Sequence, residues 1–168
     1  MTHQPLPKAI DFMTTRVQTV ATDMSLQDVV AFLRKHEVSN APVVTKNEAG
    51  QSMLVGFISE GDCLERLSNE VFHGNPAQPQ TVGTMMKRHP VCVEPETDVF
   101  ALASIFVNHR YRHLPVVEQG VLRGVVSRRD ILKALEAYYR KDFSDSSLEK
   151  FPPNLREVAN LRFVARRF

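Results

Sequence analysis

One short pattern occurs twice in this chain, and it constrains the fold more than any other feature. Ala41-Pro42-Val43-Val44 returns as Leu114-Pro115-Val116-Val117. Residues 56–64 return as residues 124–132, each with the pattern Gly-x-x-Ser-x-x-Asp. Because a unit of about 60 residues buries too little surface to be more than marginally stable alone, two such copies are expected to pack together.

The alignment of the two copies extends beyond these motifs. Equivalent residues lie 73 positions apart up to the Pro-Val-Val segment and 68 apart after it. The shortening lies between residues 46–53 of the first copy and residues 118–120 of the second. Both segments are polar, as in a surface turn, where repeats tolerate changes in length. The repeat therefore predicts two similar structures with turns of different length.

Each copy has the periodicities of a β-α-β-β-α unit, which predicts an α+β fold. The first helix has apolar residues at a spacing of about 3.6, with Ser25 or Asp98 as its N-cap. Two short Val- and Ile-rich strands form a hairpin, and a second helix follows. The predicted strands are 17–20, 42–45 and 54–58, then 91–93, 115–117 and 122–126; the predicted helices are 25–36, 60–72, 98–109 and 128–140.

These elements divide the chain into a first repeat at 11–73 and a second at 83–141. Residues 74–82, which are rich in Gly and Pro, are the expected linker. Residues 1–10 are expected to be an extended arm. Residues 142–168 form a basic tail, in which Asn154 is expected to cap a final helix. That helix is expected to pack on the module or its dimer mate, or to dock a partner.

The charge of the chain does not favour nucleic acid as a partner. The net charge is only +2. Residues 140–168 hold seven of the 21 basic and four of the 19 acidic residues, which leaves the repeats close to neutral. Neither a signal-peptide pattern nor a run of about 18 apolar residues is present. Two separate cysteines favour free thiols in a reducing compartment, so a cytoplasmic location without membrane insertion is expected.

The repeated Ser-x-x-Asp pattern has two interpretations. A serine N-cap with an acidic residue three positions later is typical of a capping box, which satisfies free N–H groups at a helix start. The same position suits a nucleotide, because the helix N-terminus attracts phosphate and an aspartate can accept hydrogen bonds from a ribose diol. Gly56 and Gly124, just before the motif, are expected to leave room for a ligand.

In each copy, a hydrophobic residue followed by Pro-Val-Val precedes the pattern Gly-h-h-Ser-x-x-Asp, where h is a hydrophobic residue. Two such copies resemble a tandem pair of cystathionine β-synthase (CBS) domains, and the resemblance covers about residues 10–140. The resemblance implies two repeats packed with pseudo-twofold symmetry. It also implies adenine nucleotides or related adenosyl ligands (AMP, ADP or ATP) in clefts between the repeats. A homodimer and a regulated effector protein are implied as partners.

The resemblance assigns ribose to Asp62 and Asp130, and phosphate to Ser59 and Ser127. Residues on the adenine side are implied to be Asn40, Ala41, Pro42, His113, Leu114 and Pro115, with Thr19, Val20 and Cys92 offering backbone groups to the base.

The two copies differ between the serine and the aspartate. The first copy has Glu60-Gly61 and the second has Arg128-Arg129. Arg128 can pair with a phosphate, and His113 can carry more positive charge than Asn40 at the same place. We therefore expect the second site to bind anionic nucleotides more tightly, unless both arginines only face solvent.

The other chemistry-bearing residues give weaker signals. His109 and His113 have a helical metal-ligand spacing, but a helix must end before Leu114-Pro115, so no metal site is predicted. Neither cysteine has an evident base nearby, and no catalytic set accompanies the aspartates. The prediction is thus a non-catalytic, stand-alone regulatory module without a catalytic cofactor. The alternative is a ligand-free structural or protein-interaction module that acts through its C-terminal tail.

Overall fold

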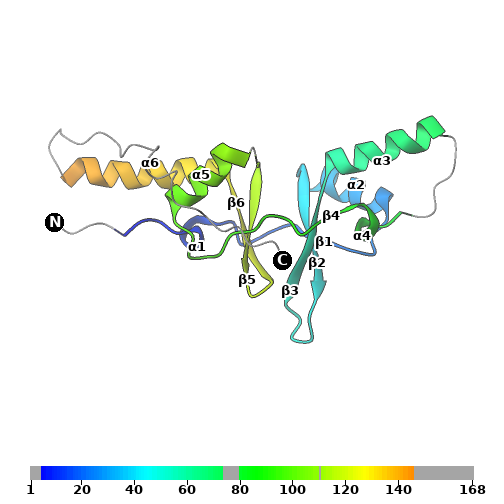
Figure 1. The fold of residues 1–168 in the computed structure, drawn as a ribbon, viewed down its shortest axis with the longest axis horizontal. Helices are drawn as coiled ribbons and strands as arrows, with labels where there is room; N and C mark the ends of the chain where they lie inside the picture. The colour runs from blue at the N-terminus through cyan, green and yellow to red at the C-terminus, as the bar shows by residue number, and fades with distance from the viewer. Residues whose placement is uncertain (1–4, 74–79, 110, 146–168) are drawn as a thin grey trace. The chain divides into compact units, whose positions relative to one another are not determined.

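The computed structural model describes residues 5–73, 80–109 and 111–145, which form two compact units (Figure 1). We name each unit after its Ser-x-x-Asp aspartate. The Asp62 unit contains described residues 16–73, 80–90 and 119–122. The Asp130 unit contains described residues 5–15, 91–109, 111–118 and 123–145. Each unit is described separately below.

The Asp62 unit is built on a small mixed sheet. Strand β1 is parallel to β2, β2 is antiparallel to β3, and β4 pairs antiparallel with β3. Helices α2 and α3 contact each other beside this sheet (Figure 1). The elements are β1 (Val20–Ala21), α2 (Leu26–Lys35), β2 (Asn40–Lys46), β3 (Ser52–Ser59), α3 (Glu60–His73), α4 (Val82–Met85) and β4 (Lys87–Arg88).

The Asp130 unit repeats this plan with shorter connections. Strands β5 and β6 are neighbours in a sheet, and Val93 forms a parallel bridge with Val116 of β5. Gln119 and Gly120 connect the strands with φ angles of 50° and 82°, the signs required by a type I′ turn. The elements are α1 (Ala9–Phe12), α5 (Val99–His109), β5 (His113–Glu118), β6 (Val121–Ser127, of which residues 123–127 belong to this unit) and α6 (Arg128–Asp145).

The main helices and hairpins confirm the sequence predictions. Ser25 caps α2, since its Oγ accepts a hydrogen bond from the Asp28 N–H at 3.1 Å. Asp98 caps α5 by accepting from the N–H groups of Phe100 and Ala101 at 2.9 and 3.0 Å. The turns also differ as expected: five residues separate β2 from β3, and two separate β5 from β6.

The beginnings of the repeats differ from the predictions. The first predicted strand is regular only at Val20–Ala21, and the strand expected at 91–93 is a single bridge at Val93. The sequence predicted an extended arm over residues 1–10, but Ala9 and Ile10 belong to helix α1. Short apolar stretches do not distinguish a single helical turn from a strand. Residues 74–79 of the predicted linker and 146–168 of the tail, including Asn154, lie outside the described residues.

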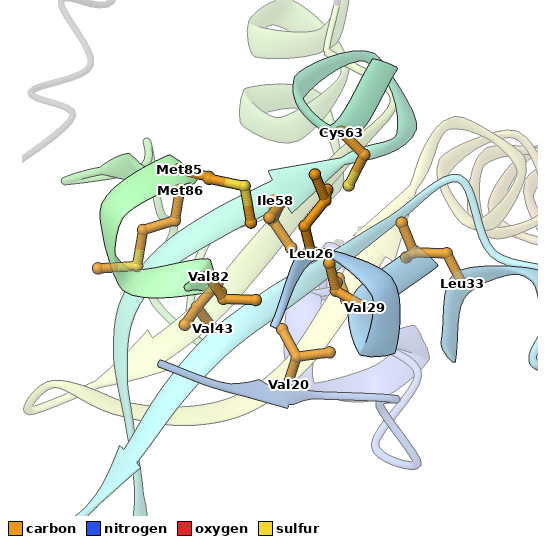
Figure 2. Close-up of a cluster of buried hydrophobic side chains, with 11 residues drawn as sticks. Val20, Leu26, Val29, Leu33, Val43, Ile58, Cys63, Val82, Met85 and Met86 are labelled. Carbon is orange, nitrogen blue, oxygen red and sulfur yellow. The ribbon is translucent and has the colours of Figure 1, made fainter. Parts of the chain in front are cut away.

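The short helix at the start of each sequence repeat, α1 or α4, packs in the unit that contains the motif of the other repeat. Helix α4 begins the second repeat in the sequence, yet Val82, Met85 and Met86 belong to the core of the Asp62 unit, beside Val43 and Ile58 (Figure 2). Conversely, Ala9 of α1 is fully buried in the core of the Asp130 unit. Each unit is therefore completed by a segment that precedes the other repeat in the chain.

Among the described residues, no helix combines the length and the apolar character needed to cross a bilayer.

Candidate functional site

The Ser59–Asp62 motif stands where β3 ends and α3 begins. The backbone N–H of Ser59 donates to Oδ2 of Asp62 at 2.8 Å, and the Ser59 hydroxyl donates to the same oxygen at 2.5 Å. The Asp62 N–H donates back to the Ser59 Oγ at 3.3 Å. This reciprocal pattern is a capping box, and it holds the carboxylate at the first turn of the helix.

The Ser127–Asp130 motif has nearly the same geometry at the junction of β6 and α6. The Ser127 N–H and hydroxyl donate to Oδ2 of Asp130 at 2.8 and 2.6 Å, and the Asp130 N–H donates to the Ser127 Oγ at 3.3 Å. In both units the serine proton is used within the motif. The serine must therefore rotate its hydroxyl away from the aspartate before it can donate to a phosphate.

The second carboxylate oxygen distinguishes the two motifs. Oδ1 of Asp62 forms an ion pair with the Nζ of Lys87 at 3.3 Å. The Asp62 side chain is 11% exposed and the Lys87 side chain 76% exposed, so the lysine reaches the carboxylate from the solvent. No lysine or arginine in the described part of the chain forms an ion pair with Asp130.

The sheet brings the other predicted residues of the Asp62 unit towards the motif. Asn40 is the register partner of Ser59 on the neighbouring strand. Ala41 and Pro42 follow it on β2 and are buried. Val20 pairs with Val43, which places the Thr19–Val20 backbone alongside the same strand. The predicted set therefore lies on three adjoining strand segments and the start of one helix.

The equivalent residues of the Asp130 unit are also brought together. The Val93 N–H donates to the Pro115 carbonyl at 3.0 Å, which sets the Cys92–Val93 backbone beside β5. His113 and Leu114 begin that strand. The Nε of Arg128 donates to the Tyr111 carbonyl at 2.7 Å, close in sequence to His113. Each unit thus collects its own set of predicted residues.

The two glycines before the motifs do not provide the expected space for a ligand. A Cβ on Gly56 would lie 2.5 Å from the Met86 Sδ, and a Cβ on Gly124 would lie 2.8 Å from the Met13 Sδ. The glycines are needed because a methionine packs directly over each backbone. Met86 is 8% exposed, and Met13 packs against the core of the Asp130 unit.

The expected positive charge of the second site is also weaker than the sequence predicted. Burial lowers the pKa of His113, and this effect outweighs the opposing influence of Asp130. The imidazole is therefore favoured in its neutral form at neutral pH, which argues against His113 as an added cation there. Arg128 is exposed, but its Nε is already bonded to a backbone carbonyl.

The remaining candidates from the sequence are the two cysteines and the histidine pair. Burial raises the pKa of Cys92 to about 11, and burial also raises the pKa of Cys63, so both thiols favour the protonated form at neutral pH. His109 ends α5 and His113 begins β5, so the two do not share one helix face. Within the described ranges, no three His, Cys, Asp or Glu residues are grouped as metal ligands would be.

Two features of the site were missed in the sequence. Lys87 is not a candidate in the sequence, because it lies outside the repeated Pro-Val-Val and Ser-x-x-Asp motifs. The repeat offset of 73 gives its counterpart as Thr14. A third Ser-x-x-Asp pattern, Ser25 to Asp28, was noted only for its serine; its hydroxyl donates to Asp28 Oδ2 at 2.7 Å. The Ser-x-x-Asp pattern can therefore cap a helix that lies outside the repeated motif.

The family comparison agrees with the repeat. The family model for the CBS domain matches residues 9–69 and 82–137, which together exceed half of the chain. The chain belongs to the CBS domain family, and its mixed helix and strand architecture with two CBS repeats is that of CBS-pair proteins.

Individual relatives show how far the similarity extends. The "CBS domain-containing protein CBSX3, mitochondrial" of Arabidopsis thaliana is 29% identical over 123 residues, covering 72% of this chain and 57% of that protein. The "CBS domain-containing protein YhcV" of Bacillus subtilis is 27% identical over 121 residues, covering 72% and 80%. A crystal structure of CBSX2, also from Arabidopsis, in complex with AMP has 27% identity and a TM-score of 0.65, covering 79% of this chain and 98% of that one.

Proposed function

We propose that this chain is a non-catalytic regulatory module that binds an adenine nucleotide, with AMP as the first ligand to test. The observation that carries the proposal is the duplicated motif. In both units a capping box leaves one aspartate oxygen, Oδ1, directed away from the serine contacts. An ionised carboxylate oxygen accepts more than one hydrogen bond, so Oδ1 suits the two hydroxyls of a ribose.

The phosphate and the adenine of the nucleotide are assigned to other groups in the same units. The helix start attracts phosphate through its dipole, and Ser59 or Ser127 can turn its hydroxyl to the phosphate while its backbone N–H still holds the aspartate. The strands that carry Asn40–Pro42 and His113–Pro115 supply the adenine side. The relative in complex with AMP supports this choice of ligand.

Regulation is proposed to arise from a population shift. A ligand that contacts one arrangement of the module better than another favours that arrangement, and the change is transmitted to an effector protein or to a second copy in a homodimer. This role requires no turnover by the module itself. A cytoplasmic location is part of the same proposal.

The proposal is tested by titration calorimetry and thermal shift with AMP, ADP, ATP and S-adenosylmethionine. A bound ligand raises the melting temperature, since at about 100 times Kd it stabilises the folded protein by about 2.7 kcal/mol. Asp62→Ala and Asp130→Ala are each expected to weaken AMP binding in their own unit by about ten-fold or more, because hydrogen bonds to a charged group are lost.

Asp28→Ala is the matched control, because Asp28 accepts a hydrogen bond from the Ser25 hydroxyl at the start of α2 in the same sequence pattern, but is exposed. It should lower stability in the manner of the other two variants and leave AMP binding intact. If millimolar adenine ligands produce no shift in the wild-type protein, the nucleotide proposal is wrong. The interaction module acting through residues 142–168 would then be favoured.

A further inference from the structure

The ion pair between Lys87 and Asp62 distinguishes the two units in a way that bears on ligand choice. Lys87 stands on β4, where it is the register partner of Phe57, two residues before Ser59. This pairing holds the lysine backbone beside the end of β3. From there its side chain reaches Oδ1 of Asp62, the oxygen that the proposed function assigns to ribose.

The Asp130 unit has a neutral residue in the corresponding place. Thr14 pairs with Val125, with N–H to carbonyl distances of 2.9 and 3.0 Å in the two directions. Val125 precedes Ser127 by two residues, as Phe57 precedes Ser59. The two backbones are therefore equivalent, and the difference is in the side chain alone: a flexible cation in one unit and a short hydroxyl in the other.

We propose that Lys87 determines the ligand specificity of the Asp62 unit by exchanging partners from Asp62 to the nucleotide phosphate. This inference rests on the proposed function. In the unliganded unit, the ammonium group neutralises Oδ1 of a carboxylate that is 11% exposed. When ribose hydroxyls occupy Oδ1, the exposed lysine is released toward the adjacent phosphate. Because a lysine ammonium is a mobile point charge on a flexible stem, it can make this exchange without movement of the backbone.

The exchange has different consequences for charged and uncharged ligands. AMP replaces the carboxylate with a phosphate as the partner of the ammonium group, so a weak exposed ion pair is lost and a stronger charge-assisted contact is gained. Adenosine breaks the same ion pair but offers no phosphate in return. Lys87 should therefore favour AMP over adenosine in the Asp62 unit. In the Asp130 unit, Thr14 supplies no comparable charge.

The test measures AMP and adenosine binding by calorimetry in protein whose other site is disabled. In the Asp130→Ala background, Lys87→Thr should weaken AMP binding by about ten-fold, the effect of one charge-assisted contact. It should tighten adenosine binding by no more than about two-fold, because adenosine then has no ion pair to break and an exposed pair is weak. Arg88→Thr is the matched control. Arg88 is the next residue of β4 and carries the same charge, but its Nη2 donates to the Gly83 carbonyl at 2.9 Å. It should leave the ratio of AMP to adenosine affinity unchanged.

The reciprocal substitution is expected to increase the affinity for AMP. Damage to the fold would not produce an increase in affinity. In the Asp62→Ala background, Thr14→Lys should tighten AMP binding several-fold and weaken adenosine binding by no more than about two-fold. Equal effects of Lys87→Thr on both ligands, or no effect on AMP, would overturn the role of Lys87 while the proposed function stands. Failure of the parent protein to bind either ligand would overturn both.

Discussion

The two units share one backbone plan and differ in the charges placed upon it. Their capping boxes agree to within 0.1 Å in each of the three hydrogen bonds. Around that common geometry, Asp62 has a lysine from β4, whereas Asp130 has a threonine in the same position and a largely neutral histidine nearby. Backbone geometry is thus the conserved part of the repeat, and electrostatics is the part that diverges.

The charges that distinguish the two units come from a different part of the chain than the repeated motifs suggest. In the sequence, the residues between serine and aspartate suggested a more cationic second site, because Arg128-Arg129 replaces Glu60-Gly61. In the structure, the cation that contacts an aspartate is Lys87, which follows Asp62 by 25 positions in the sequence and belongs to the first site, in the Asp62 unit. A repeat alignment finds such a residue only when the exchanged opening segments are compared as well.

The largest expected effect tests the backbone equivalence of the units. Gly56→Ala and Gly124→Ala should each reduce the free energy of unfolding by about 1–3 kcal/mol, because an added methyl overfills a packed site. Gly124→Ala should cost more. There the new Cβ would lie 2.8 Å from the Thr14 carbonyl oxygen, whereas at Gly56 the nearest backbone atom, the Lys87 carbonyl oxygen, is 3.0 Å away. Urea unfolding measures both.

A double-mutant cycle sharpens this result. At Gly56 the closest atom is the Met86 Sδ, so shortening Met86 to alanine should relieve much of the strain and give a large coupling energy. The corresponding cycle between Gly124 and Met13 should show less relief, because the carbonyl contact remains. Gly61→Ala serves as control, since its Cβ would meet only the Ser59 Oγ at 3.6 Å. Equal costs and equal couplings at the two glycines would refute the predicted order.

A smaller effect concerns the aspartates themselves. Asp62→Ala and Asp130→Ala should each cost about 1 kcal/mol through loss of the helix cap. Asp62→Ala should cost a few tenths of a kcal/mol more, because it also loses the ion pair with the exposed Lys87. Since that pair is screened by salt, the difference should shrink between 0.05 and 0.5 M NaCl in urea titrations. A difference that is unchanged by salt would mean that the ion pair is not its source.

The sequence predicted the elements that depend on strong local patterns. The amphipathic helices, the Ser25 and Asp98 caps, and the Val-rich hairpins all have a local physical cause, and all were confirmed. The family and its two repeats followed from the doubled motif. The single-turn helices α1 and α4 were missed because one helical turn has too few apolar positions to show a period.

Long-range features were harder to predict for a different reason. The Met86–Gly56 contact and the Lys87–Asp62 ion pair both depend on β4 pairing with β3. A two-residue strand has almost no sequence signal, so its partner cannot be inferred locally. The charge of His113 depends on burial, which residue identity alone does not determine.

The smallest effect expected is the pH dependence of His113, and it tests whether the second site is neutral. Because burial lowers the pKa of folded His113 below the usual 6.5, the unfolded chain takes up a proton first as the pH falls. The contribution of neutral His113 is full above pH 6.5 and is lost as the pH falls toward the folded pKa. His113→Asn places the residue of the first repeat, Asn40, at this position and removes that titration. The wild-type urea midpoint should therefore fall more than that of His113→Asn between pH 7.5 and 5. If His113 were instead a cation stabilised by Asp130, the wild-type protein would gain stability relative to the variant over the same range.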